Sequence, residues 1–192
     1  MLMYKDVRGP LGSDSPDGKI DDNDQQPISK NGIPRVSYGF NFTFGWKGVD
    51  VTAIFSGLGR YDIMPTDVYY RRPLPGNDNL TIWKDAWTPQ TAATAKMPSP
   101  IMNDWQGTSN AEVSSTFWLK NGAFLKLKSL IVDYSLPANL LAKSKIKAVK
   151  FYVSGENLFE WNHTKDWDPE LGGDFRTYPV LKGFTFGLNV TF

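Results

Sequence analysis

Two stretches of the chain alternate strictly between apolar residues and polar or small ones. The apolar positions of the first stretch are Phe184, Phe186, Leu188, Val190 and Phe192. Those of the second are Val36, Tyr38, Phe40, Phe42, Phe44 and Trp46. A period of two residues is typical of a β-strand with one apolar face. Because an exposed edge of large aromatics invites aggregation in water, this pattern favours strands of a membrane barrel, with the aromatic face toward lipid and the polar face toward the lumen.

Shorter alternating stretches predict further strands. Beyond a short turn at Trp46, the pattern resumes from Val49, so residues 35–58 are expected to form a tight hairpin. In the run FLKLKSLIVDYSLP the apolar residues change from odd-numbered to even-numbered positions. This change predicts a β-bulge near Lys128 or Ser129. Residues 137–145 are expected to form a short connection with one helical turn. A fourth strand follows, ending at about residue 159.

The lengths of the connections predict the topology. Residues 1–34, 59–114 and 160–182 lack periodicity and read as long loops, whereas the other two connections are short. Successive connections of an antiparallel up-and-down sheet lie at opposite ends, so all long loops fall on one side, as in outer-membrane barrels. Because such a barrel needs at least about 8 strands, the roughly five strands here are part of a larger barrel or belong to no membrane barrel.

The expected fold is therefore all-β, with antiparallel strands forming the C-terminal part of a large transmembrane barrel. Its expected segments are an acidic loop (1–34), a hairpin (35–58), a long surface loop (59–114) and the last three strands (115–192).

Composition narrows the possible functions. The 192 residues carry 21 Lys and Arg against 20 Asp and Glu, a balance that does not predict a nucleic-acid partner. The absence of Cys excludes disulfides and thiolate metal sites. No apolar run reaches the roughly 20 residues of a membrane helix. The N-terminus MLMYKDVRGP lacks the features of a signal peptide, so an export signal is expected upstream of it.

The residues that could carry out catalysis are few. His163 is the only histidine, which argues against a histidine-based nucleophile relay or a zinc site. Four acidic residues could be read as glycosidase carboxylates, namely Asp166, Asp168, Glu170 and Asp174. These lie in a Gly-rich loop that we expect to be solvated, without the apolar surroundings that raise a pKa. We therefore expect the chain not to be an enzyme.

The acidic loop contains one candidate metal site. Aligning Gly18 with the obligatory glycine of a calcium-binding loop places Asp17, Asp21 and Asp24 at positions 5, 9 and 12. Ser13 and Ser15 then take positions 1 and 3, where Asp or Asn is usual, so the loop carries little negative charge. A bound Ca²⁺ and a solvated acidic turn both remain open. No other cofactor is predicted.

Tryptophans in the predicted loops are candidates for cargo binding. The four that we single out are Trp83, Trp105, Trp161 and Trp167. Their rings can stack on sugars, or they can anchor the membrane interface and pack the loops together.

Several motifs in order along the chain resemble one protein family. These motifs are DGKIDDND, YGFNFTFGWKGVDVT, ST-x-WL, FLKLKSLIVDYSLP, FYVSGENLF, the DPE of residues 168–170, the YP of residues 178–179 and the terminal FTFGLNVTF. Together they look like the C-terminal end of a SusC/RagA-type TonB-dependent outer-membrane receptor. One departure is an insertion, RGPLGS, in the acidic loop, where the family usually has an uninterrupted D-x-N-x-D-G.

The resemblance implies a plugged barrel of roughly 22 strands that imports oligosaccharides or peptides. Its implied partners are the rest of the barrel and the plug, a SusD-like surface lipoprotein, TonB acting through a part absent from this chain, and membrane lipid. It also implies that the terminal strand, Phe184 to Phe192, closes the barrel and is read by the assembly machinery. The alternative is a secreted all-β carbohydrate-binding module, which would need a second sheet and polar outer faces.

Overall fold

The computed structural model describes most of the chain. The described residues are 2–10, 13–66, 68–71, 73, 79–99, 113–142, 145–165, 167–175 and 177–192. They form two compact units, which we describe separately. One unit comprises Ile33–Ile63, Lys120–Gly172 and Thr177–Phe192, and the other comprises Met1–Gly32, Met64–Leu119 and Gly173–Arg176.

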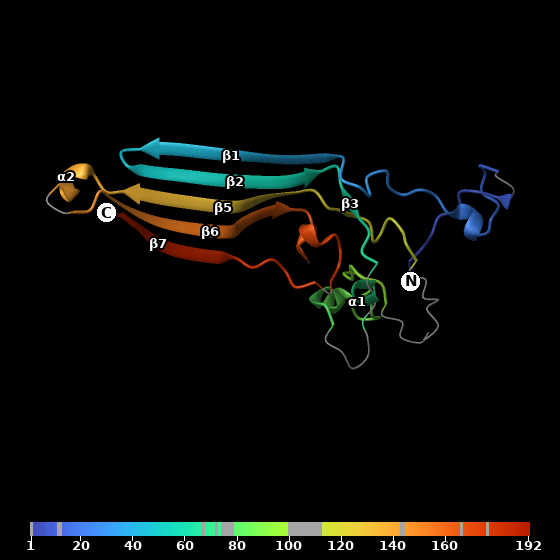
Figure 1. Cartoon of the computed structure of the whole chain (residues 1–192). Helices are drawn as coiled ribbons and strands as arrows, with labels where there is room; N and C mark the ends of the chain where they lie inside the picture. Colours follow the sequence, from blue (N-terminus) through green and yellow to red (C-terminus); the bar gives the residue numbers. More distant parts are fainter. Residues whose placement is uncertain are drawn as a thin grey trace. The chain divides into compact units, whose positions relative to one another are not determined.

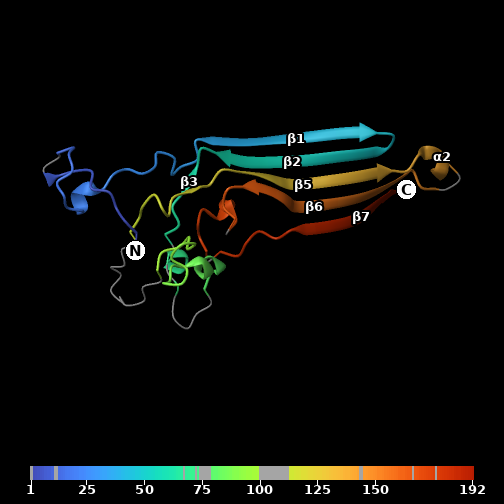
Figure 2. The same ribbon diagram turned by 180° about the vertical axis from the view of Figure 1, so that it is seen from behind.

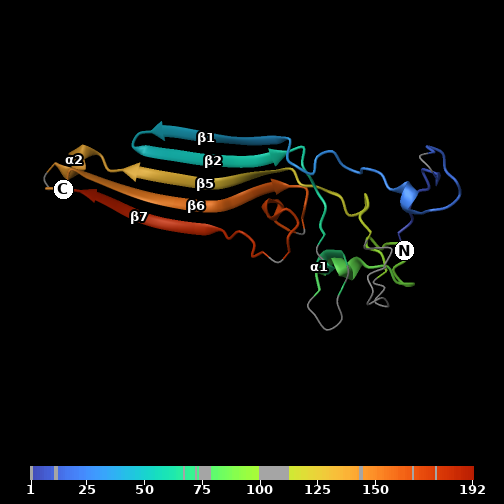
Figure 3. The same ribbon diagram turned by 45° about the vertical axis from the view of Figure 1, so that its right-hand side comes forward.

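A five-stranded antiparallel sheet makes up most of the first unit, as Figures 1 and 2 show from opposite sides. Its spatial order is β1 (Val36–Trp46), β2 (Val49–Gly59), β5 (Phe124–Ser135), β6 (Ala148–Asn162) and β7 (Gly183–Thr191). Two short strands, β3 (Asp62–Ile63) and β4 (Lys120–Asn121), pair with each other in a separate two-stranded sheet. The five long strands lie side by side in a single layer (Figure 3). Among the described residues this sheet is open, with β1 and β7 at its edges.

The two short connections lie at the same end of the sheet. Lys47 and Gly48 join β1 to β2 with φ of 48° and 85°, the positive values that a two-residue hairpin turn matching the strand twist requires. β5 is joined to β6 through α2 (Ala138–Leu141), which is the helical turn expected from the sequence. Backbone hydrogen bonds tie these connections to the strands, as from Ser135 N to the Gly48 carbonyl at 2.8 Å.

One face of the sheet is apolar across all five strands. Near the β1–β2 turn a cross-strand row consists of Trp46, Val49, Tyr134, Phe151 and Leu188. The following rows are Phe44, Val51, Val132, Val153 and Phe186, and then Phe42, Ala53, Leu130, Gly155 and Phe184. The last two rows are Phe40, Phe55, Leu127 and Phe159, and then Tyr38, Gly57, Leu125 and Trp161. The aromatic side chains remain largely exposed, Phe186 to 76% and Phe42 to 57%, so no second sheet covers this face among the described residues.

The opposite face carries mostly polar and small residues. Its rows are Gly45, Asp50, Asp133, Tyr152 and Gly187, then Thr43, Thr52, Ile131, Ser154 and Thr185, then Asn41, Ile54, Ser129, Glu156 and Gly183, and then Gly39, Ser56, Lys126 and Glu160. Tyr152 lies across Gly187 so closely that a Cβ there would overlap its ring. The division into two faces confirms the prediction from the alternating pattern.

Bulges in neighbouring strands shift the register at one level of the sheet. Leu127 pairs with Phe159 and Ser129 with Glu156, so Lys128 opposes both Asn157 and Leu158. Asn157 adopts a φ of 53°, which is uncommon for a residue with a side chain. This register is a bulge in β6. Against β2, Leu127 pairs with Phe55 and Ser129 with Ile54, so Lys128 is an extra residue in β5, and the predicted bulge near Lys128 or Ser129 is confirmed.

Short elements and a small core organise the second unit. Its elements are η2 (Asp22–Asp24), α1 (Val68–Arg71) and η3 (Thr81–Asp85). The ring of Tyr70 stacks on Phe175 at a centroid distance of 4.8 Å and meets Trp118 edge-on at 5.8 Å. Arg71 is also buried and donates a 2.6 Å hydrogen bond from Nε to the Pro65 carbonyl. The described part of the segment expected to be one long loop thus contains local structure and buried side chains.

Helices contribute little to the fold. In the described part of the chain, no helix is long and apolar enough to cross a membrane.

Candidate functional site

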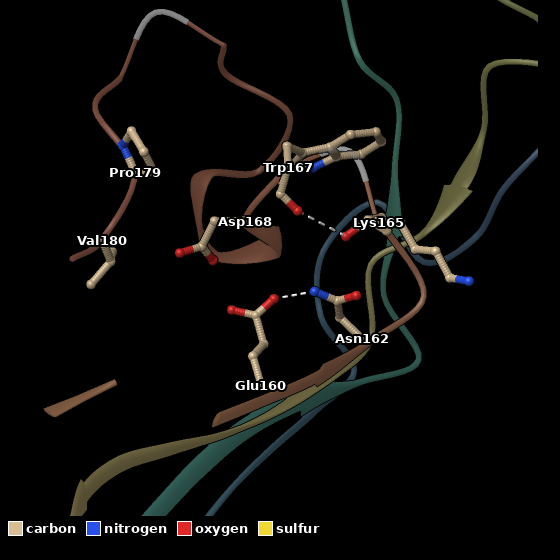
Figure 4. Close-up of a pocket in the computed structure, with 8 residues that line it drawn as sticks. Glu160, Asn162, Lys165, Trp167, Asp168, Pro179 and Val180 are labelled. Carbon is tan, nitrogen blue, oxygen red and sulfur yellow. Dashed lines mark hydrogen bonds between the residues drawn. The ribbon is translucent and has the colours of Figure 1, made fainter. Parts of the chain in front are cut away.

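A pocket lies where β6 ends and the chain leaves the sheet. Its volume is about 450 Å³. It is lined by Glu160, Asn162, Thr164, Lys165, Trp167, Asp168, Pro179 and Val180. Figure 4 shows the carboxylates of Glu160 and Asp168 directed toward the same space, with Trp167 on one side and Val180 on another, while the amino group of Lys165 points away. The pocket therefore combines two acidic groups with an aromatic ring and small apolar side chains.

Lys126 is the centre of an ion-pair cluster beside this pocket. Its side chain is 3% exposed, and its Nζ lies 2.9 Å from Glu160, 2.9 Å from Asp168 and 2.8 Å from Glu170. Lys128 donates a second bond to Glu170, at 2.7 Å. Two lysines thus face three carboxylates, an excess of one negative charge beside the pocket.

Lys126 and Lys128 reach the same carboxylate because they stand two residues apart in β5, which places both on its polar face. Lys126 projects from this face opposite Glu160, and Lys128 lies on it as well, as its bond to Glu170 shows. Lys128 is the bulge residue, and the apolar positions of β5 change parity only after it. The alternation of the sequence therefore directs both lysines toward the residues that follow β6.

The motif Asp168-Pro169-Glu170 forms a short 3₁₀ turn that presents its acids to the lysines. This turn, η5, spans Pro169–Leu171, and Asp168 caps it by accepting a 3.0 Å hydrogen bond from the Glu170 N–H. Proline suits the first position because it lacks an N–H and has a fixed φ. Gly172 ends the turn with a φ of 61°, where glycine is unstrained. The local sequence therefore determines the conformation of the turn.

The balance of burial and ion pairing sets the charge of the cluster. Burial alone would raise the pKa of Glu170, but the hydrogen bonds from Lys126 and Lys128 outweigh it and hold that pKa below the ordinary value. Removing one member of a buried ion pair generally destabilises a protein by about 3–5 kcal/mol, because a charge is left without compensation. Glu170 is therefore held in its charged form, and the cluster is sensitive to the loss of Lys126.

Asp168 and Glu170 correct one expectation from the sequence, that the carboxylates of this loop are solvated. The side chain of Asp168 is only 10% exposed and that of Glu170 23%, and both pair with lysine. Of the two other candidates, Asp166 lies outside the described residues and Asp174 belongs to the other unit. Sequence reasoning also overlooked Lys126 and Lys128 as members of a site. Their spacing of two residues, which places both side chains on one face of β5, was the signal that could have identified them.

The four tryptophans predicted to bind cargo have different positions. Trp167 lines the pocket. Trp161 projects from the apolar face, in register with Leu125, and is 69% exposed, a position that favours the alternative of an anchor at the membrane interface. Trp83 belongs to η3 in the other unit, and Trp105 lies outside the described residues.

The acidic loop differs from the arrangement expected from the sequence. Asp6, which the alignment with a calcium loop does not include, accepts a hydrogen bond from the Gly18 N–H, at 2.6 Å. Asp24 accepts from the Val7 N–H at 2.7 Å, which lowers its pKa, and Asp17 accepts from Lys19 N. In the sequence, the insertion RGPLGS thus separates Asp6 from Gly18, whose N–H it binds.

The acidic side chains singled out for Ca²⁺ have separate hydrogen-bonding roles in the described part of this loop. Asp21 caps η2, accepting from Asn23 N at 2.8 Å. Within the described ranges, no group of three or more metal-ligating side chains comes together, so Asp17, Asp21 and Asp24 do not form a common site in this conformation. Ca²⁺ binding stays a prediction.

The strand predicted to close the barrel has the expected face. Phe184, Phe186, Leu188 and Val190 share the apolar face of β7, and β7 pairs with β6 alone in the described sheet. Phe192 follows β7 and is 75% exposed.

Two curated proteins from Formosa agariphila are similar to the chain in sequence. TonB-dependent receptor P3 is 27% identical over 189 residues, covering 91% of this chain and 18% of the receptor. TonB-dependent receptor P26 is 25% identical over 178 residues, covering 83% of this chain and 17% of the receptor. The chain therefore spans less than a fifth of the length of either receptor. No protein-family profile matches the chain.

Two solved structures of the RagAB peptide importer are similar in fold. The open-open state matches with a TM-score of 0.71 and 25% identity, covering 97% of this chain and 20% of the importer chain. The closed-closed state matches with a TM-score of 0.68 and 25% identity, covering 96% and 20%.

Proposed function

We propose that this chain, which is a segment of a SusC/RagA-type TonB-dependent outer-membrane receptor, forms part of the barrel wall of a nutrient transporter. Its relatives are receptors and an importer, and the chain is not an enzyme. The observation that carries the proposal is the two-faced sheet. An aromatic face continuous over five strands suits lipid, and the polar face suits the lumen.

The two faces also weigh against the alternative of a secreted carbohydrate-binding sandwich. In a sandwich, the apolar face of each sheet must be buried against a second sheet. Here the largest aromatics of that face, such as Phe42 and Phe186, are more than half exposed. A soluble module with this surface would aggregate.

The proposed cargo is an oligosaccharide or a peptide, imported with energy relayed through TonB and with a SusD-like lipoprotein as surface partner. The name of the RagAB peptide importer supports the peptide option for that relative. For this chain both cargo classes stay open. We further propose that the pocket at the end of β6 contacts cargo, with Trp167 as a stacking surface.

The test is an uptake assay with the full-length receptor in a strain that lacks its own copy. Fluorescent oligopeptides and fluorescent malto-oligosaccharides serve as the two probes, each measured with and without an uncoupler of the proton-motive force. Uncoupler-sensitive uptake of one probe supports the proposal. Receptor that is assembled at the surface and yet takes up neither probe refutes import of these cargo classes.

A further inference from the structure

We propose that Lys126 is a positioning residue, which holds residues 163–165 and 167–172, called the segment below, against the sheet and thereby shapes the pocket for cargo. This inference rests on the proposed function, because it assumes that cargo passes the polar face of the sheet. The segment follows β6, and its Trp167 and Asp168 form one side of the pocket.

The contacts of Lys126 make it the common anchor of the segment. Both oxygens of Asp168 and one oxygen of Glu170 accept hydrogen bonds from its Nζ, at 2.8–2.9 Å. The same Nζ binds Glu160 on β6, so one ammonium group joins two strands to the segment. Lys128 binds only Glu170, and its side chain is 33% exposed.

Charge repulsion would open the segment if the ammonium group were lost. Glu160, Asp168 and Glu170 each lie within 3 Å of the Lys126 Nζ, so their carboxylates are held close to one another. Like charges at such separations, shielded from water, repel strongly. Without Lys126, the acids of the segment would move toward solvent, and Trp167 would move with them.

The opposite side of the pocket is fixed independently. Pro179 and Val180 precede β7, and the adjacent Leu181 carbonyl accepts a 3.2 Å hydrogen bond from Asn157, the bulge residue of β6. Only one side of the pocket therefore depends on Lys126, so that losing it should alter binding while the strand pairing survives.

The groups that face the pocket indicate the chemistry of its ligand. Glu160 and Asp168 offer acceptor oxygens, and Trp167 offers an aromatic surface. A neutral chain that carries N–H or O–H donors beside apolar faces fits this combination. Peptide amides and sugar hydroxyls both have this chemistry, and the two uptake probes distinguish them.

The experiment compares Lys126→Met with Lys126→Arg in the full-length receptor. Arg keeps the charge and can donate to the same carboxylates. Lys150→Met is the matched control, because Lys150 lies on β6 and forms a 3.6 Å ion pair with Asp133 away from the pocket. Glu170→Gln is the milder variant if Lys126→Met does not assemble.

Three quantities are measured for each variant. They are the amount of receptor labelled at the cell surface, the rate of trypsin cleavage after the exposed Lys165, and the half-saturating concentration of each probe. For Lys126→Met we expect cleavage after Lys165 and the half-saturating concentration to rise at least about tenfold, the change that 1.4 kcal/mol produces. The maximal uptake per assembled receptor should stay near that of the wild type. Lys126→Arg should restore most of both values, and Lys150→Met should match the wild type.

Two outcomes overturn the inference. If Lys126→Met, or Glu170→Gln in its place, only lowers the amount of assembled receptor, the lysine is structural and does not position the pocket. If cleavage accelerates while the half-saturating concentration stays constant, the segment is held by Lys126 but does not contact cargo. If the wild-type receptor takes up neither probe, the proposed function is refuted. In that case, faster trypsin cleavage of the Lys126→Met variant would still establish that Lys126 holds the segment.

Discussion

Placing a lysine on either face of β7 tests the assignment of the faces directly. Phe186 projects from the apolar face in register with Val153 and is 76% exposed. Its neighbour Thr185 projects from the polar face, opposite Ser154. The substitutions Phe186→Lys and Thr185→Lys therefore introduce the same charge at almost the same depth, one into lipid and the other into the lumen.

The register of the sheet sets the expected magnitude. The apolar rows extend from Tyr38 to Trp46, about eight residue steps, or roughly 27 Å along a strand at about 3.4 Å per residue. A strand tilt of about 40° reduces this to roughly 20 Å of height. Phe186 lies one row, roughly 5 Å in height, from the central row, where a lysine costs about 2–4 kcal/mol. We therefore expect Phe186→Lys to lower the free energy of unfolding by about 2–3 kcal/mol, roughly 30- to 150-fold in the equilibrium constant. For Thr185→Lys we expect a change below about 0.5 kcal/mol.

The assay is refolding of the urea-unfolded full-length receptor into lipid vesicles, with the free energy obtained from the denaturant midpoint. Thr43→Lys, on the same row of the polar face as Thr185, is the control for the lumen side. Equal losses for Phe186→Lys and Thr185→Lys would refute the assignment of the faces, as would a larger loss for Thr185→Lys.

Three further predictions concern the ion-pair cluster, the acidic loop and the end of the chain. A carboxylate whose folded-state pKa is lowered stabilises the fold above its unfolded pKa and loses this effect as the pH falls through the folded value. The loss in unfolding free energy caused by Glu170→Gln should therefore be constant above about pH 5, decline once the pH falls below the ordinary pKa of 4.5, and vanish below the lowered folded-state pKa. A loss that persists unchanged to about pH 3 in denaturant titrations would contradict the pairing. If Ca²⁺ binds the acidic loop, calorimetric titration should show heat with the full-length receptor that the double variant Asp17→Asn and Asp24→Asn lacks; identical traces would remove the metal assignment. Phe192→Asp should reduce the amount of receptor at the surface far more than the uptake per assembled receptor, and normal assembly with abolished uptake would argue against a role in assembly.

Which side chains share a face of the sheet follows from the sequence alone. Phe40 and Phe186 belong to alternating runs, and alternation is a local property that any extended strand converts into two faces. The change of parity around Lys128 located the bulge for the same reason. The short turn after Trp46 was equally local, because Gly48 readily adopts the positive φ that a two-residue turn requires.

Which distant residues come into contact depends on how the strands pair in the folded chain. Lys126 and Asp168 are 42 residues apart, and nothing in their local sequence distinguishes a solvated carboxylate from one that pairs with a buried lysine. Their contact depends on the register of β5 against β6 and on the path of the chain after β6. Asp6 capping Gly18 across the insertion is a second long-range contact of this kind. The pattern of residues determines the strands because alternation acts within each strand, whereas the pocket depends on charges brought together by pairing between strands.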